Sequence, residues 1–323
     1  MNIDRHTSFL SELTPDRDWA QLNGISPSEC RFPDGGSFRV EIPSVEGPAP
    51  LMAVLEEAER LGVVIHRVSQ GSGVSMLDDA EIGEMVALCA TANVELCLFL
   101  GPRGVWDVGA AATSVGTQPS MRVRGAEQLR YSLDDAFRAI ALGVRCLLVA
   151  DEGVLWRLNE LRESGELPGD VALKMSALSG PSNPASFAVI QRLGADSINV
   201  PGDLTVRQLA ELRASGSAAI DFYVESPDNL GGFVRHHEAP AFVIAAAPVY
   251  LKFGLRNAPD IYPVGQHLRQ VSDATARERV RRAHLTLELL DRNGMLPLMS
   301  PAGARQIGDL TRFMERSRMV DEV

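Results

Sequence analysis

Short runs of apolar residues alternate along the chain with longer segments in which apolar residues recur every three or four positions. Runs of the first kind are typical of buried strands, and segments of the second kind of amphipathic helices. The predicted strands are 38–42, 63–68, 94–100, 145–150, 171–177, 197–200, 220–224 and 249–253. The pattern therefore predicts a strand–helix unit that is repeated eight times along the chain.

The helical segments carry recognisable start and stop signals. Asn183-Pro184 supplies an N-cap followed by a proline in the first turn, and Thr205 supplies another N-cap. A helix is predicted to start at Ser132, in a sequence close to a capping box. The helix expected after Asn229 is the least well defined, because Pro240 lies in its path.

Eight such units predict an α/β fold, a (β/α)₈ TIM barrel. The competing fold is a doubly wound open sheet, but the count of eight and the regular spacing favour the barrel. No G-x-G-x-x-G motif follows the first strand, so no nucleotide cofactor is expected. We expect an N-terminal extension over 1–36, the barrel over 37–294 and a C-terminal helical extension over 295–323.

The charge of the chain narrows the classes of partner. Lysine and arginine together number 31 and aspartate and glutamate 42, which gives a net charge of −11. This balance argues against a nucleic-acid binder or a protein of anionic membranes, but a local basic pocket for an anionic substrate remains compatible with it. The chain has no apolar stretch of the about 20 residues that span a membrane and no signal-peptide pattern. A cytoplasmic protein with four reduced cysteines is expected.

Ionisable or amide side chains stand at the C-terminal ends of the predicted strands, where barrel enzymes carry their sites. Alternation along a strand allows five of them to point into the barrel together: Glu41, Lys174, Asn199, Glu225 and Lys252. Others stand at or just beyond strand ends: Arg67, Arg103, Asp151, Arg256 and Asn257. Because isolated buried charges are costly, this set predicts a functional site. The alternative is a charge network that only closes the top of the barrel.

Three chemistries fit these residues. Lys174 or Lys252, with a pKa lowered by the other cation, forms a Schiff base with a carbonyl substrate. Alternatively, three carboxylates hold Mg²⁺ or Mn²⁺, namely Glu41, Asp151 and Glu225. In the third, Glu41 or Glu225 acts as a general base beside a lysine without a metal.

Substrate binding is expected from a further set of residues: Arg67, Arg103, Asn199, Arg256 and Asn257. Arg103 and Arg256 are the candidates for holding an anionic group. The loop 101–124 is either a lid or a solvated insertion. The sequence Asn229-Leu-Gly-Gly232 resembles a phosphate-binding turn, and His236-His237 are expected on a solvated helix face.

One stretch resembles a known family. The sequence 194–210, GADSINVPGDLTVRQLA, is similar to the late barrel half of the collagenase-like peptidases of family U32, as are EIPS from Glu41 and KFGLRN from Lys252. The resemblance implies a barrel with a site at its top. It departs from the family at Glu225, where His-Gly is usual, and in having no cysteine after Cys146. Neither iron–sulfur binding nor peptidase activity is therefore carried over.

These patterns together predict a barrel enzyme, a hydrolase or a lyase, that acts on a small anionic or carbonyl-containing substrate. The alternatives are a lysine Schiff-base aldolase or lyase and a non-catalytic ligand-binding barrel. Ile307, Leu310 and Met314 form an apolar stripe that would pack on the barrel or on a second copy in a homo-oligomer.

Overall fold

Eight parallel strands close into a barrel in the order of the sequence. The computed structural model describes residues 25–101 and 122–304. The strands are β1 Phe38–Pro43, β2 Arg67–Ser69, β3 Glu95–Phe99, β4 Cys146–Val149, β5 Ala172–Met175, β6 Ser197–Asn199, β7 Ala219–Glu225 and β8 Val249–Phe253. The predicted (β/α)₈ TIM barrel is confirmed.

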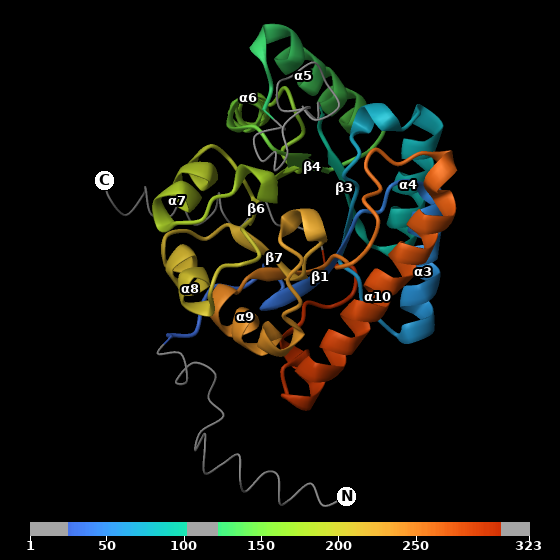
Figure 1. Ribbon diagram of the computed structural model, residues 1–323. Coiled ribbons are helices and arrows are strands. Elements are labelled where there is room, and N and C mark those ends of the chain that lie inside the picture. Colours follow the sequence, from blue (N-terminus) through green and yellow to red (C-terminus); the bar gives the residue numbers. More distant parts are fainter. Residues whose placement is uncertain (1–24, 102–121, 305–323) are drawn as a thin grey trace, which may run out of the picture.

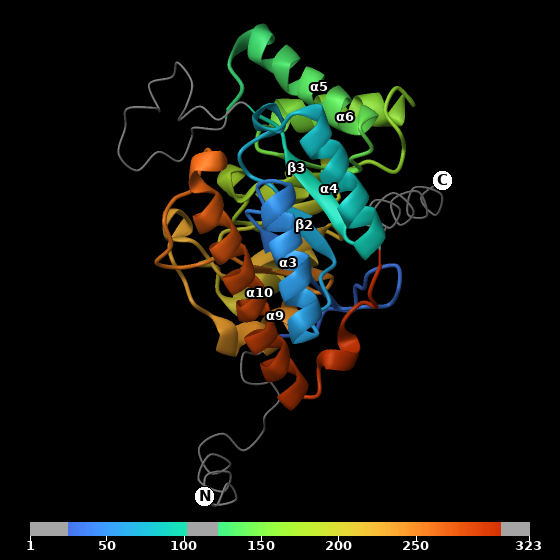
Figure 2. The same ribbon diagram turned by 90° about the vertical axis from the view of Figure 1, so that its right-hand side faces the viewer.

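A helix follows each strand and packs on the outside of the barrel (Figure 1). The helices are α3 Pro48–Leu61, α4 Asp79–Ala92, α5 Gly125–Ala141, α6 Glu152–Glu163, α7 Pro184–Arg192, α8 Val206–Ala214, α9 Ala239–Ala246 and α10 Arg269–Arg292. Short 3₁₀ segments are η1 Val74–Met76, η3 Ala177–Ser179, η4 Asp228–Leu230, η5 His236–Glu238, η6 Gln266–Leu268 and η7 Leu296–Leu298. The last helix, α10, lies beside α3, so the first and last units of the barrel are in contact (Figure 2).

Most of the predicted helix starts are confirmed by their caps. Asn183 and Thr205 each accept a hydrogen bond from the backbone three residues on, in capping boxes that begin α7 and α8. The start predicted at Ser132 is wrong, because α5 already begins at Gly125 and the Ser132 hydroxyl donates to the Gly101 carbonyl instead. Pro240 does not interrupt α9. It occupies the first turn of that helix, where a missing N–H costs nothing.

The two faces of the barrel wall differ in chemistry. Aliphatic side chains such as Val40, Ile42 and Val68 point outward and form one continuous core with the helices. The opposite face, which points inward, carries charged and polar residues in register, for example Glu41 beside Arg67 and Lys252. The wall is therefore stabilised from outside by apolar burial, and its interior is left for polar groups.

Some sequence-based expectations lie outside the described residues. Arg103, most of the loop 101–124 and the stripe of Ile307, Leu310 and Met314 belong to this group. No helix within 25–101 or 122–304 is both long and apolar enough to cross a bilayer.

Candidate functional site

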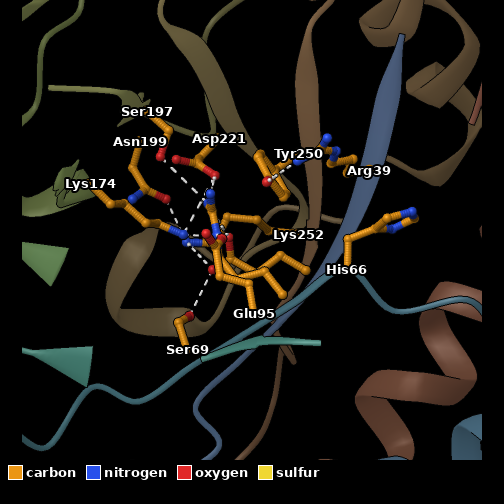
Figure 3. Close-up of polar contacts among 12 residues, drawn as sticks. Arg39, His66, Ser69, Glu95, Lys174, Ser197, Asn199, Asp221, Tyr250 and Lys252 are labelled. Atoms are coloured by element: carbon orange, nitrogen blue, oxygen red, sulfur yellow. Dashed lines mark hydrogen bonds and ion pairs between the residues drawn. The ribbon is translucent and has the colours of Figure 1, made fainter. Parts of the chain in front are cut away.

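A single carboxylate, that of Glu41 on β1, receives both lysines of the barrel interior. The Lys174 ammonium donates to Oε2 of Glu41, and Lys252 Nζ lies 3.4 Å from Oε1. Arg67 Nη1 also donates to Oε2, at 3.2 Å, and the Ser69 hydroxyl donates to Oε1, at 2.7 Å. Figure 3 shows the side chains of Ser69, Lys174 and Lys252 pointing toward one another from β2, β5 and β8. All five residues are buried.

Strand register explains why these residues meet. Glu41 is the direct partner of Arg67 on β2 and of Lys252 on β8. Lys174 reaches across from β5, on the far side of the barrel, because long side chains of opposite strands fill the interior of a small barrel. Closure of the barrel therefore assembles the cluster from residues distant in sequence.

Two further carboxylates complete the cluster. Asp221 on β7 accepts from Arg67 Nη1 at 2.9 Å and lies 3.5 Å from Lys174 Nζ. Glu95 on β3 binds Arg67 Nε at 2.5 Å. The six charged groups are three carboxylates and three cations, so their formal charges cancel: Glu41, Glu95, Asp221, Arg67, Lys174 and Lys252. We refer to these six residues as the interior network.

The network fixes the ionisation of its members. Burial acts to raise the pKa of Glu41, but the nearby charges of Lys174, Lys252 and Arg67 outweigh it and hold that pKa well below its ordinary value. Burial acts to lower the pKa of Arg67, yet Glu95 and other nearby groups raise it well above its ordinary value. Glu41 is therefore ionised at neutral pH.

Lys252 is the lysine closest to solvent. Its side chain is 4% exposed, whereas that of Lys174 is completely buried. Lys252 Nζ donates to Asn199 Oδ1 at 2.5 Å and lies 4.4 Å from the centre of the Tyr223 ring. The Asn199 amide is itself oriented, since its Nδ2 donates to the Met175 carbonyl at 2.8 Å. Lys252 thus has a defined position on the side of the interior network that is nearest to solvent.

The N-terminal side of the network is closed by stacked groups. The Arg67 guanidinium lies 3.7 Å from the centre of the Tyr250 ring, and the Tyr250 hydroxyl accepts from Arg39 at 3.1 Å. Arg39 in turn stacks on Phe32 and pairs with Asp34 at 2.7 Å. Figure 3 shows Arg39 and His66 set apart from the lysines. We therefore place the open side of the network at Lys252.

The small number of lysines in the chain is a signal that the analysis of each strand end did not use. Of the 31 lysine and arginine residues in the chain, only two are lysine, Lys174 and Lys252. Both belong to the interior network.

Glu95 and Asp221 belong to the network too, but the sequence analysis did not predict them as site residues. Each stands two residues before another inward-pointing residue, Cys97 and Tyr223 respectively. Strict alternation along the strands could therefore have found them.

Glu225 was expected with Glu41, but the structure does not bring them together. A register shift between Tyr223 and Glu225 breaks the alternation at the end of β7. Glu225 Oε2 contacts His236 Nε2 at 3.0 Å and lies 3.5 Å from Arg282 Nε. Burial acts to raise the pKa of Glu225, but these partners and the Arg256 N–H lower it overall. Glu225 thus links β7 to α10.

His236 also lies elsewhere than expected. It belongs to the 3₁₀ segment η5, and its Nδ1 is 2.6 Å from the Thr286 hydroxyl of α10. Its partners are therefore Glu225 and Thr286, and not solvent alone. His237, by contrast, is exposed.

Asp151 caps a helix. Its Oδ1 accepts from the backbone N–H groups of Gly153 and Val154 at the start of α6, and its Oδ2 accepts from Val123. The three predicted metal ligands, Glu41, Asp151 and Glu225, therefore have separate sets of partners. Within the described parts of the chain, no group of three or more histidine, cysteine or acidic residues is arranged to hold a metal ion.

Arg256 and Asn257, in the loop after β8, are both hydrogen-bonded to the loop after β7. Arg256 Nη1 donates to the Gly232 carbonyl at 2.6 Å, and its side chain is 57% exposed. The Asn257 N–H donates to Asp228. The backbone N–H groups of residues 230–233 all donate within their own loop, so the expected phosphate-binding turn has none of them free.

Comparison with known proteins shows likeness at the level of fold. No family model matches the chain, and no curated protein matches it. A structure of the U32 peptidase Mk0906 is 15% identical, covers 71% of this chain and 97% of its own, and has a TM-score of 0.40. The homocysteine methyltransferase MmuM of Escherichia coli is 13% identical over 71% and 83% of the two chains, with a TM-score of 0.46. The delta-aminolevulinic acid dehydratase of Toxoplasma gondii is 13% identical over 74% and 87%, with a TM-score of 0.45.

Proposed function

We propose that this protein is a barrel enzyme that acts on a small molecule carrying a carbonyl or anionic group. The observation that carries the proposal is the pair of lysines on one ionised carboxylate, Glu41, at the C-terminal side of the barrel interior. Amines and carboxylates in one dry cluster can bind a polar substrate and exchange protons with it.

Each residue of the cluster has a distinct role in this proposal. Lys252 and Asn199 contact the substrate, because they stand at the edge of the network nearest solvent. Glu41 accepts a proton. Lys174 and Arg67 hold the Glu41 carboxylate in place and ionised. The exposed Arg256 is the candidate for an anionic group of the substrate.

Of the two reaction classes predicted from the sequence, a lyase fits this cluster better than a hydrolase. Primary amines condense with aldehydes and ketones, and this chemistry activates carbon–carbon bonds next to the carbonyl. Hydrolysis of a peptide, which the U32 resemblance suggests, needs an activated nucleophile or water of another kind.

A second candidate function is a ligand-binding barrel without catalysis. The observation that favours it is the exact cancellation of charge among three carboxylates and three cations. Because the network is already neutral, it needs no substrate to balance its charge, and holding the strands together can be its whole role. Turnover separates the two candidates.

The experiment is a substrate screen with matched variants. The purified protein is incubated with pools of small oxoacids, sugar phosphates and dicarboxylates, and the depletion of each compound is followed by mass spectrometry. We expect at least one compound to be consumed by the wild type but not by Lys252→Met or Asn199→Ala. Glu59→Gln is the control, since Glu59 is exposed on α3, outside the barrel wall.

The interpretation of the screen depends on which variants consume the compound. Consumption by the wild type and by Glu59→Gln alone supports the proposal. Equal consumption by all variants that fold contradicts the placement of the site. Binding of a compound without its consumption favours the ligand-binding barrel.

A further inference from the structure

We infer that the Lys252 amine forms a covalent imine with the carbonyl carbon of its substrate, so that the substrate is an aldehyde or a ketone. This inference rests on the proposed function and names the substrate class of the same site. It is carried by two observations: where this chain uses lysine, and what surrounds each of its two lysines.

The first observation is the restriction of lysine to the barrel interior. The chain places arginine at 29 positions and lysine only at 174 and 252. Burial alone does not demand lysine, because Arg39 and Arg67 are just as deeply buried inside the same barrel. Arginine differs from lysine in that it does not give up its proton in proteins and is not a nucleophile. A position at which arginine cannot replace lysine is therefore one that uses the amine or its compact shape.

The second observation separates the two lysines. Lys174 is completely buried and bound to two carboxylates, Glu41 and Asp221. Lys252 has a neutral amide acceptor on Asn199, a Tyr223 ring beside it and a single carboxylate oxygen, 3.4 Å away. Its amine is thus the less tightly paired of the two, and its side chain is the one that is not completely buried. Lys174 is a positioning residue for Glu41.

The steps balance without any added reagent. Lys252 first passes a proton from Nζ to Glu41, and the neutral nitrogen attacks the carbonyl carbon. A carbon–nitrogen bond forms, the carbonyl π electrons move to oxygen, and a proton moves from nitrogen to that oxygen. The resulting hydroxyl takes the proton held by Glu41 and leaves as water, while the nitrogen lone pair completes the C=N bond. Glu41 ends ionised, as it began.

The test is reductive trapping with three probes: pyruvate, glyoxylate and dihydroxyacetone. Sodium borohydride converts an imine into a stable secondary amine, whose added mass is located by peptide mapping. Because the chain has only two lysines, every side-chain adduct falls on one of two peptides. Lys252→Arg keeps the charge and removes the nucleophile. Glu59→Gln, on an exposed face of α3, is the control. Circular dichroism confirms that each variant is folded.

We expect adduct on the peptide that contains Lys252, and at least about tenfold less adduct in Lys252→Arg, because a guanidinium does not condense with carbonyls. Glu59→Gln should retain the adduct. If Lys252→Arg does not fold, the mapped position of the adduct on the wild type decides the question.

Three results would overturn the inference. They are adduct on Lys174 or the N-terminal amine alone, undiminished adduct in Lys252→Arg, and no adduct with any of the three probes. None of them affects the broader proposal if the substrate screen still shows consumption that depends on Lys252 and Asn199. Failure of both experiments removes the proposed function as well.

Discussion

At the scale of single residues, the barrel interior shows how burial and charge act against each other. Burial penalises every ionised group, yet neighbouring charges keep Glu41 ionised. For His66, the contacts that oppose burial, with the Ser300 carbonyl and Asp34, are too weak to offset it. Its Nδ1 accepts from the Val40 N–H at 3.0 Å, so Nε2 carries the proton that faces the Ser300 carbonyl. Burial, with a smaller contribution from Arg39, lowers the pKa of His66 to about 4.

This pKa predicts an acid-sensitive fold. Between about pH 6.5 and pH 4 the unfolded chain protonates His66 and the folded chain does not, so stability falls as the pH falls through this range. The full effect is about 3 kcal/mol. His66→Asn, which keeps an acceptor near Nδ1, should flatten the dependence of the unfolding free energy on pH. Urea unfolding at several pH values measures it.

The exposed His237 supplies the control for this prediction. His237→Asn should keep the pH dependence of the wild type. If His66→Asn and the wild type lose stability in parallel below pH 6.5, another group is responsible.

At the scale of secondary-structure elements, strand ends decide which residues share a site. Alternation from the sequence correctly placed Glu41, Lys174, Asn199 and Lys252 inside the barrel. It failed for Glu225, because the register shift at the end of β7 turns that carboxylate toward η5 and α10. Bulges of this kind depend on contacts between strands, which no local pattern in the sequence records.

Helix caps limit the prediction of site residues from the sequence in the same way. Asp151 follows β4 as expected for a site residue, but it also precedes a helix, and both roles use an acidic residue at that point. The structure assigns it to the start of α6. Whether an acidic residue after a strand binds a ligand or caps a helix depends on where its side chain points, and the sequence does not show this.

The capping role of Asp151 makes a specific prediction. Asp151→Ala should lower the unfolding free energy by about 1 kcal/mol, because two N–H groups of α6 lose their acceptor. Asp151→Asn retains an acceptor oxygen and should recover most of the loss. Thermal or urea unfolding gives both values. A variant Asp151→Asn as unstable as Asp151→Ala would show that the negative charge matters more than the cap.

At the scale of the whole molecule, the fold combines an apolar shell with a charged axis. The strand–helix repeat predicted the shell, because the helices bury apolar side chains against the wall. The six-residue interior network was only partly predictable, because its members come from six different strands and meet only when the barrel closes. Charge balance within it is a property of the closed barrel.

Removing one charged member of the interior network should therefore lower the unfolding free energy more than removing two members of opposite charge. Glu41→Gln leaves Lys174, Lys252 and Arg67 without their shared carboxylate and should lower the unfolding free energy by about 3–5 kcal/mol. Adding Lys174→Met should restore part of that loss. Glu59→Gln, on an exposed face of α3, should change stability by less than about 0.5 kcal/mol. Urea unfolding of five proteins tests this: the wild type, the double variant and the single variants Glu41→Gln, Lys174→Met and Glu59→Gln. Additive losses in the double variant would rule out charge balance as the cause.

The scarcity of lysine has a practical consequence for proteolysis. An endoproteinase that cuts only after lysine has two target bonds in this chain, and both lie within barrel strands, β5 and β8. Cleavage requires those strands to leave the sheet, so fraying of the chain ends or motion of a surface loop does not expose either bond. The rate of digestion by such an enzyme should follow opening of the barrel itself. Three fragments would then appear together from an otherwise intact chain.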